Sequence, residues 1–231
     1  MEKNELSLHR SRSIQAVLSD GYHLYARHFW CLVRSSWLQA VIYALAFALL
    51  MASFFTHLLP RAMGHLSIGS ELTVSIGTLL LFLLAAILLA GAGAVAPLKQ
   101  HSESDTISGP LRWWGNWPLK LTMQSMVRLP RMLWTVMRHH TGAFISVCLV
   151  MLLVVLIATV LFMLPAVVMA IANIEAATGT AAGDAVEMPD NLFWMNFATF
   201  GICGLLQAYI HLSTLFPLYY LWGNEKMKKE K

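Results

Sequence analysis

Charged residues are scarce in this chain of 231 residues, because Asp, Glu, Lys and Arg together make up only 12% of it. A soluble globular domain usually carries about 25% charged residues. Apolar residues account for 58% of the sequence, so too little polar surface is available to coat a soluble body of this size. The shortage of charge therefore argues against an ordinary soluble domain and favours a membrane protein.

Cysteine and catalytic motifs are also lacking. Cys31, Cys148 and Cys203 are far apart and show no C-x-x-C spacing, which argues against a disulfide framework or a zinc site. No phosphate-binding P-loop, H-E-x-x-H or G-x-S-x-G motif occurs, and no pair of carboxylates is placed for acid–base catalysis. We therefore expect no enzymatic activity, no cofactor and no metal site.

Four long apolar runs are present instead, at residues 38–59, 72–98, 143–172 and 192–222. Each reaches or exceeds the roughly 20 residues that a helix needs to cross a hydrocarbon core about 30 Å thick. Helix is the expected state, since lipid offers no partner for open backbone groups. The predicted fold is all-α: a polytopic transmembrane four-helix bundle with amphipathic interfacial helices on the cytoplasmic side.

The remaining segments divide the chain around these spans. We predict an amphipathic N-terminal segment at 1–37, a first transmembrane pair at 38–98 and a basic linker with an interfacial helix at 99–142. A second transmembrane pair at 143–222 and a basic tail at 223–231 complete the division.

The basic residues predict the orientation of the chain. Fifteen of the 16 lysines and arginines lie in the N-terminal segment, the linker, or the tail, and only Arg61 lies between the first two spans. The loop between the last two spans carries four acidic residues and no basic one. The positive-inside rule therefore places both termini in the cytoplasm. From the small size and compact loops we expect a bacterial cytoplasmic (inner) membrane.

Two stretches beside the spans have the pattern of interfacial helices. In the first, six apolar residues share one helical face, namely Ile14, Leu18, Tyr22, Tyr25, Phe29 and Leu32. The second lies in the linker, where a basic stripe predicts binding of anionic lipid headgroups by Lys120, Arg128, Arg131 and Arg138. Nucleic acid is not an expected partner, because the basic residues flank apolar spans.

Small residues recur in the first two spans at a spacing of four. The strips that they form are Ala40, Ala44, Ala48 and Ala52 in the first span, and Ala86, Ala90 and Ala94 in the second. Such strips allow two helices to approach closely. We expect the first two spans to pack against each other, or one of them against the fourth.

The fourth span is the most polar. Its polar residues recur at three-to-four spacing and so share one face, which contains Asn196, Thr199, Cys203, Gln207, His211 and Thr214. Polar groups at membrane depth are costly unless they face protein or water, so this face should point into the bundle. It is interpreted either as hydrogen-bonding contacts between helices or as a path for a substrate or proton, with His211 as the titratable group.

Two further features concern the third span and the loop after it. Pro165 should bend the helix by freeing the carbonyl near Leu161. The acidic segment 173–191 is predicted to be a solvated, flexible outer loop.

The leading functional hypothesis is a non-enzymatic membrane scaffold or interaction protein. Its partners would be anionic lipids of the bilayer, a second copy of itself or another membrane protein. The alternative is a small transporter or channel subunit with a polar path along the fourth span. A lipid-modifying enzyme would depend on His139, His140 and the nearby arginines, and we rank it last.

Overall fold

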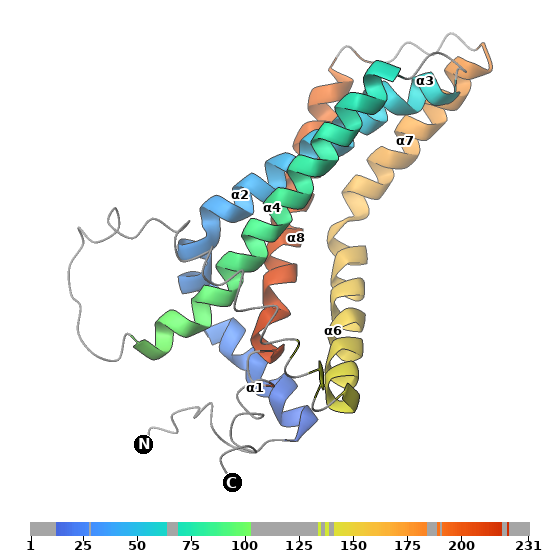
Figure 1. Cartoon of the computed structure of the whole chain (residues 1–231). Helices are drawn as coiled ribbons and strands as arrows, with labels where there is room; N and C mark the ends of the chain where they lie inside the picture. The colour runs from blue at the N-terminus through green and yellow to red at the C-terminus, as the bar shows by residue number, and fades with distance from the viewer. Residues whose placement is uncertain are drawn as a thin grey trace, which may run out of the picture. The chain divides into compact units, whose positions relative to one another are not determined.

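The computed structural model describes residues 13–27, 29–63, 69–102, 134, 137–138, 141–183, 189, 191–218 and 221. Its elements, all helical, are α1 (Ile14–Arg27), α2 (Phe29–Ser53), the π-helix η1 (Phe54–Leu58), α3 (Leu59–Met63), α4 (Gly69–Ser102), α6 (Thr141–Phe162), α7 (Leu164–Ala181) and α8 (Leu192–Ser213) (Figure 1). The all-α prediction is confirmed for this part of the chain.

Four helical segments are long and apolar enough to cross a membrane: Ser36–Met63, Gly69–Gly91, Thr141–Phe162 and Leu192–Leu218. They coincide with the four predicted spans, with shifted ends. The chain is therefore an integral membrane protein by the length and composition of its helices.

The chain divides into two compact units. The first comprises Met1–Trp37, Ala90–Leu156 and Ile210–Lys231, and the second comprises Leu38–Leu89 and Ile157–Tyr209.

The core of the first unit is centred on Val17, Val147, Met151 and Leu221. Gly21 of α1 lies so close to Pro217 that a Cβ atom there would be 2.8 Å from the Pro217 Cα. The first predicted amphipathic stretch is helical from Ile14 to Arg27. Ile14 is 40% exposed, whereas Val17 and Gly21 are the residues of α1 that are buried. A small residue, not a large apolar one, allows this contact.

The core of the second unit contains Ala48, Ala166, Phe200 and Cys203. All four alanines of the predicted strip in the first span are buried. A Cβ atom on Gly204 of α8 would lie 2.9 Å from Phe47 Cδ1 and 3.3 Å from Ala44 Cα, so α2 and α8 are in close contact. The expected close approach is therefore between the first and fourth spans.

The buried face of α4 differs from the predicted alanine strip. Thr78, Ala85 and Leu89 are buried, whereas Ala86 is half-buried and Ala90 is exposed. The side chain of Ala94 lies outside the described residues. The rings of Tyr43 and Phe47 on α2 contact the Phe82 ring, which lies on the same face of α4 as Ala85. Bulky aromatic contacts, not an alanine strip, therefore hold α4 against α2.

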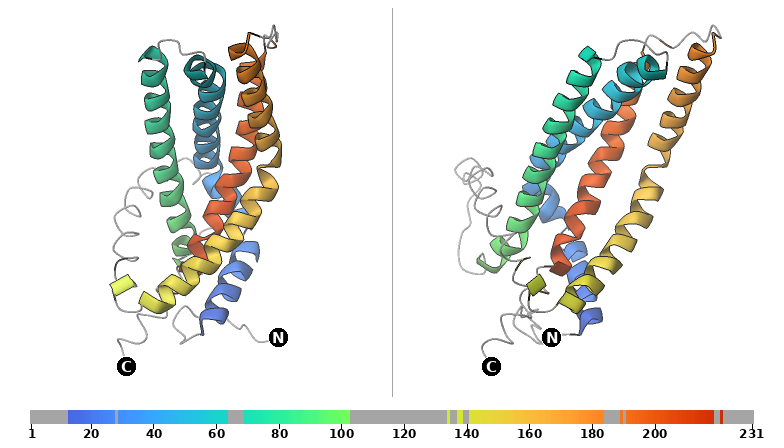
Figure 2. Two further views of the ribbon diagram at one scale, coloured as in Figure 1. Left: turned by 90° about the vertical axis from the view of Figure 1, so that its right-hand side faces the viewer. Right: turned by 45° about the vertical axis from the view of Figure 1, so that its right-hand side comes forward.

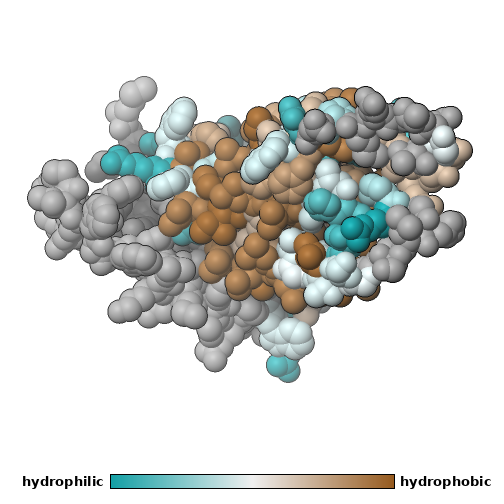
Figure 3. Space-filling model, turned by 90° about the horizontal axis from the view of Figure 1, so that it is seen from above, coloured by the Kyte–Doolittle hydropathy of each residue, from teal (hydrophilic) through white to brown (hydrophobic). Residues whose placement is uncertain are grey.

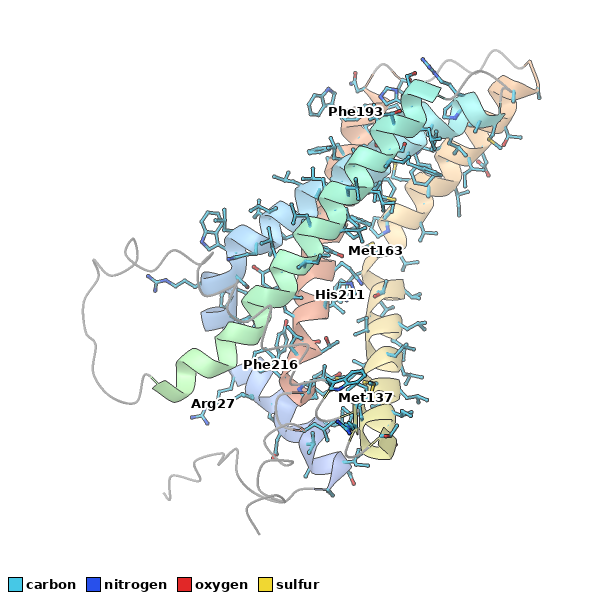
Figure 4. All side chains as sticks on the ribbon, in the orientation of Figure 1. Arg27, Met137, Met163, Phe193, His211 and Phe216 are labelled. Carbon is cyan, nitrogen blue, oxygen red and sulfur yellow. The ribbon has the colours of Figure 1, made fainter. Side chains whose placement is uncertain are left out.

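Two helix irregularities coincide with prolines. A proline removes one helical hydrogen bond and its ring collides with the carbonyl four residues before it. Pro60 opposes Thr56, which lies inside the π-helix η1. Pro165 opposes Leu161, and α6 ends at Phe162 while α7 begins at Leu164 (Figure 4). The predicted interruption of the third span is confirmed.

The helix after this interruption is longer than predicted. Residues 173–181 belong to α7 and are not a flexible loop, and Asn173 is buried. The segment is rich in alanine, the best helix former. α7 ends near Gly183, whose positive φ of 88° is a backbone conformation that favours glycine after a helix. In the same unit, α7 packs against α3 and η1.

Large apolar side chains cover much of the exposed surface. Only 11% of the most apolar stretch of the third span is buried, compared with 44% in the first and 50% in the fourth. Brown apolar atoms also occupy much of the face seen in Figure 3. The exposed residues of α6 are mainly Leu, Ile and Val, as suits a helix surrounded by lipid.

The close contact at Gly204 provides a stability test. We expect Gly204→Leu to lower the free energy of unfolding by about 2 kcal/mol, because the new side chain must displace the Phe47 ring and the α2 backbone. Gly77→Leu is the matched control, since a Cβ atom at Gly77 meets nothing within 4 Å. Unfolding in detergent measures both, and equal stability of the two variants would contradict the contact.

Candidate functional site

The polar face of α8 is the candidate site. Asn196, Cys203 and Gln207 are buried, Thr199 and Thr214 are half-buried, and His211 is exposed. The predicted inward orientation therefore holds for the first two-thirds of the helix. It ends at His211, one turn beyond Gln207.

Asn196 forms a reciprocal amide pair with Asn173 of α7, within the second unit. Asn173 Nδ2 donates to Asn196 Oδ1 at 2.8 Å, and Asn196 Nδ2 donates to Asn173 Oδ1 at 3.1 Å. Asn173 Nδ2 also donates to the Met169 carbonyl at 2.6 Å. Asn196 is fully buried, so an apolar replacement of Asn173 would leave the Asn196 amide without this hydrogen-bond partner.

Gln207 forms a second polar contact in the same unit. Its Nε2 lies 2.9 Å from Thr159 Oγ1, and its Oε1 lies 3.2 Å from the same hydroxyl. Thr159 is on α6, four residues before the interruption at Met163. Gln207 thereby connects α8 to the third span on the other side of the interruption from Asn173.

Apolar and small side chains fill the space between these two polar contacts. Ala166 and Phe200 belong to one buried cluster with Cys203, and Met163 and Ala170 pack against it. Since Asn196 pairs with Asn173 and Gln207 with Thr159, the two chain segments run antiparallel. Figure 2 shows α7 beside the first half of α8 in both views. Asn196, Cys203 and Gln207 of the predicted polar face thus lie in contacts between helices.

The two remaining members of the predicted set lie at the end of α8. Thr214 donates its Oγ1 hydrogen to the His211 carbonyl at 2.7 Å, and its backbone N–H donates to the same oxygen at 3.2 Å. α8 ends at Ser213 and the chain is helical again from 215 to 218, so the ribbon continues past His211 to Phe216 in Figure 4. The Thr214 side chain is therefore engaged with the helix terminus.

The predicted headgroup-binding residues are only partly described. Lys120, Arg128 and Arg131 lie outside the described residues. Arg138 is helical and exposed, as is Trp134 four residues before it.

Sequence reasoning missed both partners of the α8 face. Thr159 is one of few polar residues in the third span, and Asn173 was assigned to the outer loop. A usable signal existed: a polar side chain within an apolar span needs a partner at similar depth in another helix. Applied to Gln207 and Asn196, this requirement leaves few candidates in the neighbouring span.

Two buried polar atoms lack a hydrogen-bond partner in the described part of the chain: Tyr22 Oη and Gln39 Oε1. Burial raises the pKa of the Tyr22 hydroxyl, which therefore stays protonated at neutral pH. Across the described ranges, no three His, Cys, Asp or Glu side chains converge as metal ligands.

Comparison of the chain with protein families, with characterised proteins and with solved structures found no match.

The Asn173–Asn196 pair can be tested by a double-mutant cycle. We expect Asn173→Leu and Asn196→Leu each to lower the free energy of unfolding by about 2 kcal/mol, because each leaves a buried amide unpaired. The double variant should lose much less than the sum of the two single variants, since no amide then remains unpaired.

Unfolding of the purified protein in mixed micelles measures this coupling. Thr199→Val is the control on the same face, since Thr199 is only half-buried, and it should change stability by less than about 0.5 kcal/mol. Additive losses for the two asparagines would contradict the pairing.

Proposed function

We propose that the protein is a non-enzymatic, multi-pass scaffold or interaction protein of a bacterial cytoplasmic membrane, with both termini in the cytoplasm. Its partners in this proposal are anionic lipids at the cytoplasmic face and either a second copy of the chain or another membrane protein.

The engagement of the α8 polar face is the observation that supports this proposal most. Polar side chains at membrane depth usually serve either transport or helix contacts. Asn196 and Gln207 are buried and hydrogen-bonded to Asn173 and Thr159, so they act between helices. A role in holding the helices of this chain together accounts for these residues without invoking a substrate.

The exposed apolar surface of α6 is a second supporting feature. Its exposed side chains include Leu149, Leu152, Leu156 and Val160, all of them bulky and aliphatic. A scaffold needs such a surface for contacts with acyl chains and with the helices of other membrane proteins.

The cationic linker provides a test of lipid binding. We expect combined reversal of Lys120, Arg128 and Arg131 to Glu to detach this segment from anionic bilayers, because each basic residue near such a surface contributes about 1 kcal/mol. The readout is a Met126→Cys probe in a chain without its three native cysteines. In the reversed protein this probe should react with a water-soluble thiol reagent at least tenfold faster than in the protein that keeps the three basic residues.

The matched control is the same pair of proteins in bilayers of zwitterionic lipid, where the reversal should have little effect. Equal labelling rates of the two proteins in anionic bilayers would count against lipid binding by this segment.

The exposure of His211 favours the second candidate, a small transporter or channel subunit. The His211 side chain is exposed, unlike Gln207 one turn earlier. Under the scaffold proposal, His211→Leu should leave the protein level, its unfolding and its crosslinked partners in native membranes unchanged.

His57→Leu, which changes another exposed histidine, is the control. Solute or proton flux through wild-type proteoliposomes that His211→Leu abolishes and His57→Leu preserves would favour the transporter instead.

A further inference from the structure

The N-terminal part of α2 carries an exposed cation between two exposed indoles. Trp30 is 80% exposed, Trp37 is 45% exposed and Arg34 is also exposed. The spacings of four and three residues place all three on one face of the helix. Their positions extend over about 10 Å of the helix axis at 1.5 Å per residue.

This triplet lies where the exposed surface of α2 changes character. The exposed large side chains that follow along the helix are Leu38, Ile42 and Leu45, all aliphatic. The candidate span begins at Ser36. Each polar interfacial layer of a bilayer is about 5–8 Å thick, so the triplet is long enough to reach across the whole headgroup level. Tryptophan is also enriched at this level.

Arg34 has no carboxylate to neutralise it on its own helix, since α2 contains no Asp or Glu. The one ion pair given for the described acidic residues joins Arg61 to Glu71. A guanidinium presents a planar fork of N–H donors that matches phosphate oxygens. The indole N–H groups of the two flanking tryptophans add two further donors.

The same spacing of a tryptophan and an arginine recurs before the third span. Trp134 and Arg138 are four residues apart, both helical and both exposed. Each pair therefore precedes the first span of one transmembrane pair. This recurrence favours a shared role at the membrane surface over a chance grouping on α2.

We propose that Trp30, Arg34 and Trp37 form a binding site for the phosphate group of an anionic phospholipid in the cytoplasmic leaflet. The proposal rests on the proposed orientation and deepens it by naming a lipid site outside the linker. Arg34 binds the phosphate oxygens, and the two indoles flank the headgroup. A single cation on a helix that contains no carboxylate favours a headgroup of net negative charge over one that carries an ammonium group.

The test uses the full-length protein in micelles that contain equal amounts of phosphatidylglycerol and phosphatidylcholine. Native mass spectrometry measures how much of each lipid stays bound. Arg34→Gln should lower the retained phosphatidylglycerol by roughly threefold to tenfold. Arg34→Lys should retain an intermediate amount, because it keeps the charge and loses the fork.

Arg27→Gln is the matched control, since it removes the same charge from an exposed arginine near the end of α1 and should leave lipid retention unchanged. Trp30→Leu and Trp37→Leu should each lower phosphatidylglycerol retention at least twofold. Trp30 is exposed enough that its replacement tests the site even if an arginine variant folds poorly.

Four results would each overturn the proposal: unchanged retention in Arg34→Gln, an equal loss in Arg27→Gln, equal retention of the two lipids by the wild type, or displacement of the lipid by millimolar inorganic phosphate. Crosslinking of this triplet to a partner protein in place of lipid would do the same. Labelling of the linker and partner crosslinking are separate readouts, so a failure here is distinguishable from failure of the scaffold proposal.

Discussion

The pairing of buried amides between α8 and the interrupted third span is the constraint on which the second unit depends. Lipid is as apolar as the side chains that it surrounds, so burial of apolar surface contributes little to contact between spanning helices. Hydrogen bonds and close packing must supply the specificity. Asn196 and Gln207 each find one partner on the neighbouring segment, and together they set its direction and register. A shift of one turn would leave both amides unpaired within apolar surroundings.

The interruption at Met163 fits this register. Asn196 and Gln207 are separated by 11 residues, which extend about 16 Å along a helix, whereas Thr159 and Asn173 are separated by 14, or about 21 Å. The break between α6 and α7 falls within the longer of these two stretches, between Thr159 and Asn173. Small residues act with the amides: Gly204 lies against Ala44 and Phe47, so α8 is held by close packing on α2 and by polar contacts on α7.

The faces of the helices were predicted less well than the helices themselves. In α4 the alanines at 86, 90 and 94 were expected to pack, but Ala85 and Leu89 are buried and Ala90 is exposed. A spanning helix carries apolar residues on all sides, because both lipid and protein neighbours are apolar. Hydrophobic periodicity therefore does not identify the face that contacts protein, and only the shapes of the neighbours do.

The sequence by itself determined the all-helical state, the four spans and the interruption at Pro165, because chain-local physics controls them. Apolar length, backbone hydrogen bonding and the missing N–H of proline act within one segment. Only the tertiary structure decided that Asn196 pairs with Asn173, that Gln207 meets Thr159, and that Gly204 lies against α2. These contacts join residues far apart in the chain, and each depends on the depth and rotation of two helices at once. Helix rotation has no signature in a uniformly apolar span, so the partners of the polar face emerged only when the helices were placed side by side.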